Sequence, residues 1–269
     1  METTRGVNPW TRCAHCAAYF LLGSYALDSE VAHTETLPWG QLQAGRDLNV
    51  FKHRMFAAVL RILAKHQPPP ARILDVGCSF GGFGIEATRA GYEVYGMDIN
   101  PAAVEYVRSI GLEAECCSTP DELLGVPSGS LDVVSCLDCH GLWPDQPTQL
   151  RAIHGKLKPG GFLVMRVVDK SWMFTIGRHL IPLAPRLAGL VMREAVNDNR
   201  FSMPVHSLKR QLEDEGFEVA AASIWSAMHS YQTRWPAKAS FALGAFLWPV
   251  SRRNYAPGAV LIAKCRSTG

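Results

Sequence analysis

The chain has 269 residues, of which 48% are hydrophobic and 19% charged, a composition that can bury a sizeable core and excludes a disordered tail. This length fits one domain with additions, or one domain and a small appendage. The formal net charge of +3 is too small to predict nucleic-acid binding. Residues 170–269 hold 13 Lys and Arg against 6 Asp and Glu, which could attract an anionic substrate or simply form a solvated face. No uncharged apolar run reaches the roughly 18 residues of a membrane-spanning helix, so we expect no stable membrane insertion.

The first 50 residues are predicted to form an N-terminal extension, irregular over residues 1–45. An apolar stretch over residues 16–27, preceded by Arg5 and Arg12, resembles the core of a secretory signal peptide. Its positive charges are spread too thinly for that role, so we expect a cytoplasmic protein.

The eight cysteines lie mostly in apolar, strand-like segments, which is typical of reduced and buried thiols. Cys13 and Cys16 have the spacing of half a zinc knuckle. A structural zinc ion requires about four ligands, and only His15, His33 or a partner chain could supply the others. We therefore interpret the pair as a relic of a knuckle or as buried thiols, and predict no metal.

Beyond this extension, strand-like and helix-like segments alternate. Residues 51–65 carry apolar side chains at helical spacing, and Pro68 to Pro70 end that helix. Asn100 and Pro101 are typical of the first residues of a helix. Further helices are predicted at 81–90, 101–110, 149–157 and 207–215, and strands at 72–77, 93–97, 114–117, 131–136, 162–168, 217–221 and 259–265. This alternation predicts an α/β fold with a doubly wound, parallel sheet.

A glycine turn after the first of these strands carries the strongest functional signal. Gly77 would let a ligand approach the backbone, and Gly81 and Gly82 let the chain turn tightly into a helix. The N-terminus of that helix can hold a polar or anionic group. Asp98 ends the second strand, 21 residues after Gly77, where a carboxylate can accept both hydroxyls of a ribose.

This arrangement fits either a nicotinamide dinucleotide or an adenosyl compound. Ser79 replaces the middle glycine of the dinucleotide fingerprint G-x-G-x-x-G, which weakens the first alternative. Asp75, on the strand before the turn, can orient the loop and reach an amino group of a ligand. A carboxylate at this place suits a cationic amino-acid moiety better than a pyrophosphate.

These residues resemble the first motif of the class I S-adenosylmethionine-dependent methyltransferases. The resemblance covers roughly residues 50–265 and rests on five landmarks in order: residues 74–78, Asp98, and residues 131–134, 157–161 and 201–219. It implies a Rossmann-like sheet of seven strands, with residues 259–265 inserted antiparallel as the last strand, in a domain of residues 51–269. It also implies S-adenosylmethionine as the cofactor.

The resemblance assigns the methionine part of the cofactor to the glycine loop. Asp75, Gly77 and Ser79 would surround it, and Cys78 and Gly81 belong to the same loop. Arg54, on the helix before the domain, could pair with the methionine carboxylate or be a surface charge.

The same resemblance places the adenosine along the next strands. Asp98 would bind the ribose and Ile99 would pack on the adenine. Cys117 and Ser118 would contact the adenine edge, where relatives more often carry an acidic residue. Two residues that end the fourth strand would lie beneath the sulfonium: Cys136 and Leu137.

Methyl transfer is a displacement on an activated sulfonium, so the protein mainly aligns acceptor, methyl group and sulfur. A base is required only when the acceptor arrives protonated. Many relatives carry a Glu-His pair after the fourth strand, but Gly141 and Leu142 stand there in this chain. His140 or Asp138 could serve as the base instead, since histidine titrates near neutral pH. Alternatively, His140 caps local backbone and catalysis needs no base.

Two apolar, aromatic segments, residues 170–200 and 236–255, lie where family members build a helical lid over the acceptor. Trp172, Phe174, Phe246 and others would give it aromatic walls suited to a partly apolar acceptor. They could instead cover the sheet or the second copy of a homodimer.

The sequence thus predicts an S-adenosylmethionine-dependent methyltransferase that acts on oxygen, nitrogen or carbon of a small-molecule biosynthetic intermediate. Two alternatives stay open. One is an enzyme that uses bound S-adenosylmethionine without redox chemistry for a cyclisation or elimination, and the other is an inactive adenosyl-binding partner.

Overall fold

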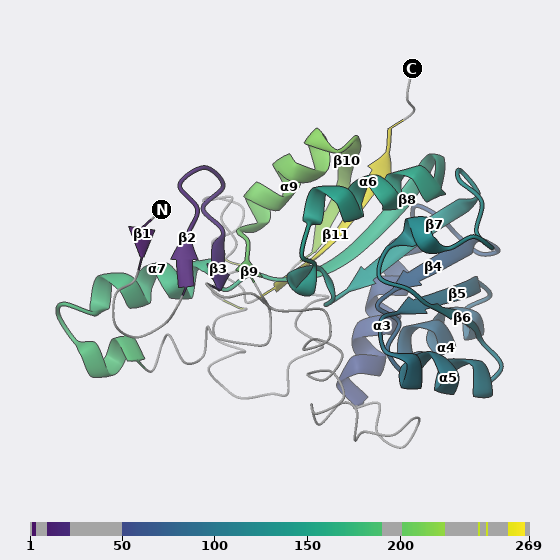
Figure 1. Cartoon of the computed structure of the whole chain (residues 1–269), viewed down its shortest axis with the longest axis horizontal. Helices are drawn as coiled ribbons and strands as arrows, with labels where there is room; N and C mark the ends of the chain where they lie inside the picture. The colour runs from purple at the N-terminus through teal and green to yellow at the C-terminus, as the bar shows by residue number, and fades with distance from the viewer. Residues whose placement is uncertain are drawn as a thin grey trace.

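A computed structural model of the chain describes residues 2–3, 10–21, 50–189, 201–223, 242, 246 and 258–266. Its centre is a seven-stranded sheet in the order β10-β11-β8-β7-β4-β5-β6 (Figure 1). The strands are β4 (Arg72–Val76), β5 (Glu93–Asp98), β6 (Glu113–Cys116), β7 (Leu131–Leu137), β8 (Leu157–Val168), β10 (Phe217–Ser223) and β11 (Gly258–Cys265). β11 is antiparallel to β8 and β10, and the pairs from β8 to β6 are parallel. The predicted doubly wound sheet with an inserted antiparallel last strand is confirmed.

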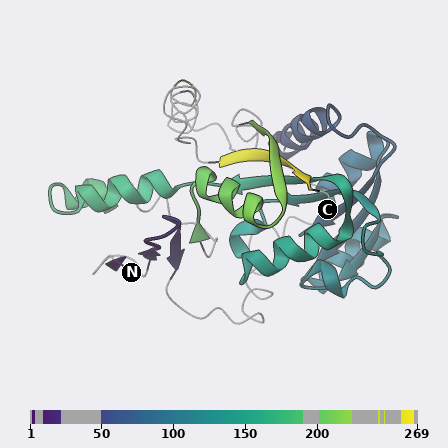
Figure 2. The same ribbon diagram turned by 90° about the horizontal axis from the view of Figure 1, so that it is seen from above.

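Helices cover both faces of this sheet. The helices α3 (Val50–Leu63), α4 (Gly82–Arg89) and α5 (Pro101–Ser109) pack on one face, where Ile73 and Val133 belong to the core. The helices α6 (Gln146–Lys156) and α9 (Val205–Asp214) pack on the other face, against Leu74 and Val134. Successive residues of a strand point to opposite faces, which is why Ile73 and Leu74 enter different clusters. Figure 2 shows α3 and α6 on opposite sides of the sheet.

The helix starts follow from local chemistry. The Asn100 side chain accepts hydrogen bonds from the amides of Ala102 and Ala103, and Pro101 occupies the first helical position, as predicted. α6 begins at Gln146, three residues earlier than predicted, because Asp145 caps it through the amide of Thr148.

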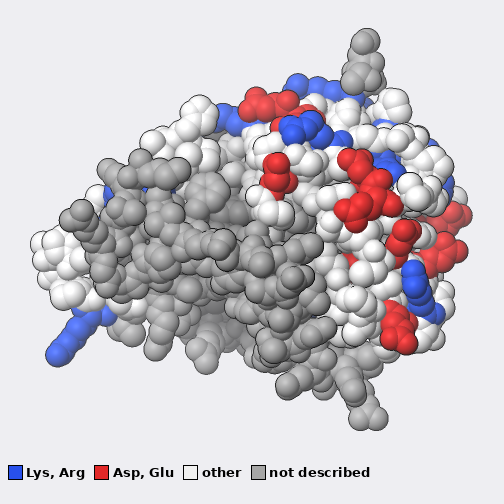
Figure 3. Space-filling model, in the orientation of Figure 1, with Lys and Arg blue, Asp and Glu red and all other residues white. Residues whose placement is uncertain are grey.

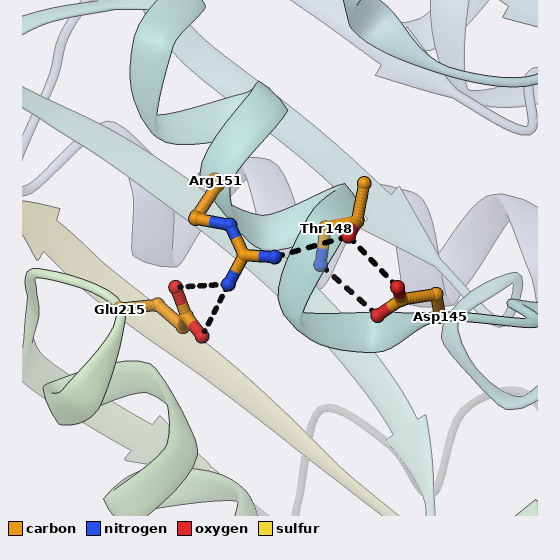
Figure 4. Close-up of polar contacts among 4 residues, drawn as sticks. All are labelled: Asp145, Thr148, Arg151 and Glu215. Atoms are coloured by element: carbon orange, nitrogen blue, oxygen red, sulfur yellow. Dashed lines mark hydrogen bonds and ion pairs between the residues drawn. The ribbon is translucent and has the colours of Figure 1, made fainter.

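A polar cluster joins α6 to the end of α9. Asp145 accepts hydrogen bonds from the amide and the hydroxyl of Thr148, at 3.2 and 2.8 Å. Arg151 donates to Thr148 Oγ1 and pairs with Glu215, the residue that follows α9, at 3.2 Å (Figure 4). This exposed contact orients two helices of the same face and lies apart from the glycine turn.

The N-terminal residues form a second, smaller sheet, which the sequence analysis missed. β1 (Glu2–Thr3), β2 (Trp10–Arg12), β3 (Tyr19–Leu21) and β9 (Phe201–Ser202) pair antiparallel in that order. The prediction of irregular structure is therefore wrong for these strands. Each strand has only two or three residues, too few for a detectable alternation, and β9 lies about 180 residues away in sequence.

The first predicted lid segment contains α7 (Ser171–Leu180), which lies beside β3 in Figures 1 and 2. The Phe174 ring is 1% exposed and stacks on the Tyr19 ring, with 4.8 Å between centroids. This face of α7 therefore packs on the small sheet, and the part of Phe174 in an acceptor wall stays a prediction. The remaining lid residues, 190–200 and nearly all of 236–255, lie outside the described residues.

Positive and negative side chains are interspersed over the described part of the face in Figure 3. Among the described residues, no helix combines the length and the apolar character needed to cross a membrane.

Candidate functional site

The candidate site lies where the strand order reverses. β4 has β5 on one side and β7 on the other, and all three strands end at the same edge of the sheet. In open α/β sheets, ligands bind at the carboxyl ends of the strands at such a switch point. Apart from Arg54, which lies on α3, the predicted cofactor residues lie near or just after the ends of β4, β5, β6 and β7, so the fold brings them to one edge.

Hydrogen bonds to β5 hold the glycine loop after β4. The amides of Gly77 and Cys78 donate to the Met97 carbonyl oxygen at 2.8 and 2.9 Å. The buried Cys78 side chain packs so closely on Gly96 that a Cβ at Gly96 would lie 2.9 Å from its sulfur. The loop then enters α4 through Gly81, whose φ of +75° suits glycine.

Packing gives a second reason for glycine at position 77, whereas the predicted approach of a ligand to its backbone stays a prediction. Its φ is +71°, and a Cβ there would lie 2.8 Å from Cβ of Cys139, in the loop after β7. The thiol of Cys139 donates to the Val76 carbonyl oxygen at 3.1 Å. Because Gly77 has no side chain, the loop after β7 can pack directly on it, and the two loops interlock at the switch point.

Asp98, at the end of β5, links the glycine loop to α5. One carboxylate oxygen accepts the amide of Ser79 at 2.8 Å, and the other accepts the amide of Asn100 at 2.9 Å. Burial raises the pKa of Asp98, against the lowering effect of the amides of Asn100, Ser79 and Ile99. Each carboxylate oxygen has a further lone pair for a hydroxyl group. The position predicted to bind a ribose is thus rigidly held.

Asp75 is buried inside β4, with 3% of its surface exposed. Its Oδ1 atom accepts the Ser135 hydroxyl of β7 at 2.7 Å. Burial raises the pKa of Asp75 to about 7, the Ser135 hydrogen bond lowers it, and the negative charge of Asp98 raises it. A neighbouring cation would favour the ionised form of this carboxyl group.

The residues after β6 meet an acidic side chain that the sequence analysis missed. Cys117 is buried, its amide donates to the Asp98 carbonyl oxygen at 3.1 Å, and burial raises the pKa of its thiol to about 12. Both the amide and the hydroxyl of Ser118 donate to Glu122, at 3.0 and 2.7 Å. These bonds lower the pKa of Glu122, which lies in the 3₁₀ helix η1 (Pro120–Glu122). An acidic side chain thus lies beside Ser118, supplied from four residues later in the sequence.

The loop after β7 holds both predicted bases. Asp138 has a φ of +72° and forms an ion pair with Arg166 of β8, whose carbonyl oxygen accepts the Asp138 amide at 3.0 Å. His140 starts the 3₁₀ helix η2 (His140–Leu142), is 4% exposed and packs edge-on against Trp143. Burial lowers the pKa of His140 to about 3, so its ring is neutral at pH 7 and a weak base.

Cys136 and Leu137, the last residues of β7, lie just before this loop. The sulfur of Cys136 is fully buried, 3.4 Å from the sulfur of Cys139. Leu137 is partly buried on the face that α3 and α4 cover. Both residues reach the edge at which the sulfonium was predicted, although their contact with it stays a prediction.

On α3, Arg54 is exposed, whereas Lys52, which the sequence analysis overlooked, is partly buried. Burial lowers the pKa of Lys52, the charge of Asp138 raises it and the charge of Arg166 lowers it, so these three side chains lie near one another. The pairing of Arg54 with a methionine carboxylate stays a prediction.

Cys13 and Cys16 lie in the turn between β2 and β3, where the Cys13 amide donates to the Ala18 carbonyl oxygen at 2.8 Å. Within the described ranges, no three His, Cys, Asp or Glu side chains come together in a way that could hold a metal ion.

Comparison with known proteins agrees with this geometry. A family model described as a methyltransferase domain matches residues 46–222. The ubiquinone biosynthesis O-methyltransferase of Xanthomonas axonopodis pv. citri (strain 306) is 30% identical over 115 residues, which are 41% of this chain and 48% of that protein. The chain spans about half the length of the curated relatives it matches.

Solved structures show the same fold at low sequence identity. The magnesium protoporphyrin IX methyltransferase of Synechocystis PCC 6803, with bound SAH, has a TM-score of 0.56 at 16% identity, over 89% of this chain and 99% of that one. The [4+2]-cyclase SpnF has a TM-score of 0.50 at 17% identity, over 78% and 81% of the two chains. These likenesses concern the fold, whereas the family model covers more than half of the sequence. The chain therefore belongs to the class I S-adenosylmethionine-dependent methyltransferases.

Proposed function

We propose that the protein transfers the methyl group of S-adenosylmethionine to a small-molecule biosynthetic intermediate. The observation that carries this proposal is the pair of carboxylates, Asp75 and Asp98, on either side of the Gly77 turn at the switch point. The matched relatives are O-methyltransferases by name, which favours oxygen over nitrogen or carbon as the acceptor atom.

The two carboxylates fit the polar ends of the cofactor. Asp75 is a buried carboxyl group with a raised pKa, which a cationic amino group would stabilise in its ionised form. Asp98 keeps acceptor capacity for the hydroxyls of a ribose. When bound, the cofactor supplies an activated methyl group on a sulfonium. The role of the protein's own residues is to hold sulfur, methyl group and acceptor in line. Such alignment accounts for much of the rate acceleration in these reactions.

The identity of a base stays a prediction. Of the two candidates, His140 is buried and weakly basic, so we assign its ring to the packing of η2. Asp138 has a side chain that is 30% exposed and thus remains accessible to an acceptor, although Arg166 pairs with it. We propose that any proton removal by the protein involves Asp138.

Incubation with S-adenosylmethionine labelled in its methyl group, together with a panel of hydroxylated small molecules, tests the function. Label in the product, lost in Asp98→Ala, supports methyl transfer. A transformed but unlabelled product would favour the cyclisation or elimination alternative, which deserves a test because the fold is shared with a cyclase. Cofactor binding without any product would favour an inactive adenosyl-binding partner.

The predicted setting and partners are part of the proposal. All eight cysteines are free thiols in the structure, which suits the reducing cytoplasm that we propose as the location. We also propose no nucleic-acid partner. A homodimer is testable by light scattering of the purified chain, which reports its mass directly.

A further inference from the structure

Two cysteine side chains meet where β7 gives way to the following loop, in the order C-x-x-C. The sulfur atoms of Cys136 and Cys139 are 3.4 Å apart. In a continuous strand, residues three apart point to opposite faces of the sheet, and their Cα atoms lie about 10 Å apart. Here β7 ends at Leu137, and the chain turns at Asp138, whose φ is +72°. This turn brings the two thiols into contact.

The two thiols differ in their exposure to solvent. Cys139 is partly exposed, whereas Cys136 is fully buried. An oxidant in solution therefore reaches Cys139 first. Burial raises the pKa of the Cys136 thiol well above its ordinary value, and its contact with Cys139 adds to this effect. Cys136 thus stays a protonated thiol until its neighbour is oxidised, which is the arrangement of a resolving cysteine beside a reactive one.

The sulfur of Cys139 also touches the glycine turn. Its thiol donates to the Val76 carbonyl oxygen at 3.1 Å, and a Cβ at Gly77 would lie 3.2 Å from the sulfur. The two sulfurs of a disulfide are about 2.0 Å apart, so those of Cys136 and Cys139 would have to approach by about 1.4 Å. Oxidation also removes the hydrogen that Cys139 donates to Val76. Forming the bond therefore withdraws a contact that holds the glycine turn.

We propose that Cys136 and Cys139 form a reversible disulfide when the protein meets a peroxide, and that this bond weakens cofactor binding at the glycine turn. The effect on the cofactor rests on the proposed function, whereas the bond itself does not. The pair is thus an oxidation site that lowers occupancy of the cofactor site under oxidising conditions and releases this inhibition on reduction.

The chemistry balances with hydrogen peroxide as the oxidant. The sulfur of Cys139 attacks one peroxide oxygen, the O–O bond breaks, and the thiol proton leaves in a molecule of water, which gives a sulfenic acid. The sulfur of Cys136 then attacks the Cys139 sulfur, the S–O bond breaks, and the Cys136 proton leaves in a second molecule of water. The two thiols lose two electrons and two protons, which reduce the peroxide. A dithiol reverses the bond by thiol–disulfide exchange.

Peptide mass spectrometry locates the bond. The reduced protein is treated with equimolar hydrogen peroxide, and the remaining thiols are alkylated with N-ethylmaleimide. We expect Cys136 and Cys139 to escape alkylation, in a peptide lighter by two hydrogen atoms. Trypsin leaves residues 109–151 as one peptide that also holds Cys116 and Cys117, so fragmentation between residues 117 and 136 must place the bond.

Calorimetry with S-adenosylhomocysteine measures the effect on the cofactor site without any acceptor. Oxidation of the wild-type protein should lower the affinity about tenfold, a usual size for coupling between sites, and dithiothreitol should restore it. Cys139→Ser keeps a hydroxyl that can donate to Val76 but cannot form the bond, so its affinity should be equal before and after peroxide. Cys116→Ser is the matched control, because it removes an exposed thiol outside the pair and should respond to peroxide as the wild type does.

The other outcomes decide against the proposal. Alkylation of both thiols after peroxide treatment, or a bond that joins other cysteines, would overturn the oxidation site. A bond between Cys136 and Cys139 that leaves the affinity unchanged would overturn its effect on the cofactor, as would an equal loss in Cys139→Ser or a loss that dithiothreitol does not reverse. Reduced protein that binds no S-adenosylhomocysteine would refute the cofactor site itself, a failure that stays distinct because mass spectrometry detects the bond separately.

Discussion

Replacing Asp75 by Asn tests the electrostatic basis of cofactor binding. Asp75 is buried in β4, accepts the Ser135 hydroxyl and has a pKa of about 7 in the structure. If the amino group of the cofactor approaches this carboxyl group, binding favours the ionised form and releases a proton. Affinity should therefore rise with pH in the wild-type protein and lose this dependence in Asp75→Asn.

The size of the effect follows from the pKa of about 7. About one-tenth of the carboxyl groups are ionised at pH 6 and about nine-tenths at pH 8, so affinity should rise about tenfold, equivalent to about 1.4 kcal/mol. At pH 7, binding should release about half a proton. The raised pKa of Asp75 also makes the free energy of unfolding depend on pH. Because burial raises the folded-state pKa of Asp75 above 3.8, the stability that this group contributes is lost as the pH rises through about 7.

Calorimetry with S-adenosylhomocysteine, in two buffers of different ionisation enthalpy, measures both affinity and proton release between pH 6 and pH 8. Asp132→Asn is the matched control. Asp132 lies at the opposite edge of the sheet, and hydrogen bonds from Arg72 and Lys158 hold its pKa below the usual range despite partial burial. Affinity that stays constant across this pH range in the wild type, or equal proton release by Asp75→Asn, would refute the reasoning.

Three further substitutions separate binding, packing and catalysis. Asp98→Ala should weaken S-adenosylhomocysteine binding at least about tenfold in calorimetry, because charged hydrogen bonds to the ribose are lost; an unchanged dissociation constant would contradict its assignment. Gly77→Ala should lower stability by about 1–3 kcal/mol, more than Gly111→Ala, which shares a positive φ but has no neighbour within 4 Å of the new Cβ. Similar losses in thermal unfolding would show that Cys139 is not the cause. His140→Ala should cost about 2–4 kcal/mol of stability, and a wild-type rate step near pH 6.5 that disappears in this variant would restore His140 as the base.

The cofactor half of the site could be predicted because it depends on short, contiguous segments. The Gly77 turn, Asp98 at the end of β5 and the cap at Asn100 each need only a few neighbouring residues to be recognised. The doubly wound, parallel sheet followed from the regular alternation of helices and strands, whereas its antiparallel last strand followed from the resemblance to the family. Local chemistry fixes these features, so long-range packing changes their bounds by only a few residues.

Features that depend on distant residues could not be predicted in the same way. Nothing in the spacing of residues indicates that Cys139 packs on Gly77, or that Glu122 bonds Ser118 from η1. Lys52 belongs to an amphipathic helix, in which a lysine is expected on the solvated face. His140 was judged by the usual pKa of histidine, which holds in water, whereas its burial lowers the pKa to about 3.

The two residues that follow β7 connect its end to the glycine turn. Asp138 faces Arg166 of β8, whereas Cys139, the next residue, packs on Gly77 and bonds the Val76 carbonyl oxygen. Asp138 and Cys139 are consecutive in the chain, so we expect a large displacement of Asp138 to disturb the packing of Cys139 on Gly77. The interlocked loops thus connect the end of β7 to the glycine turn, where the methionine part of the cofactor is predicted to bind. We therefore expect the alignment of the reacting atoms to depend on this packed contact as well as on the two ligands.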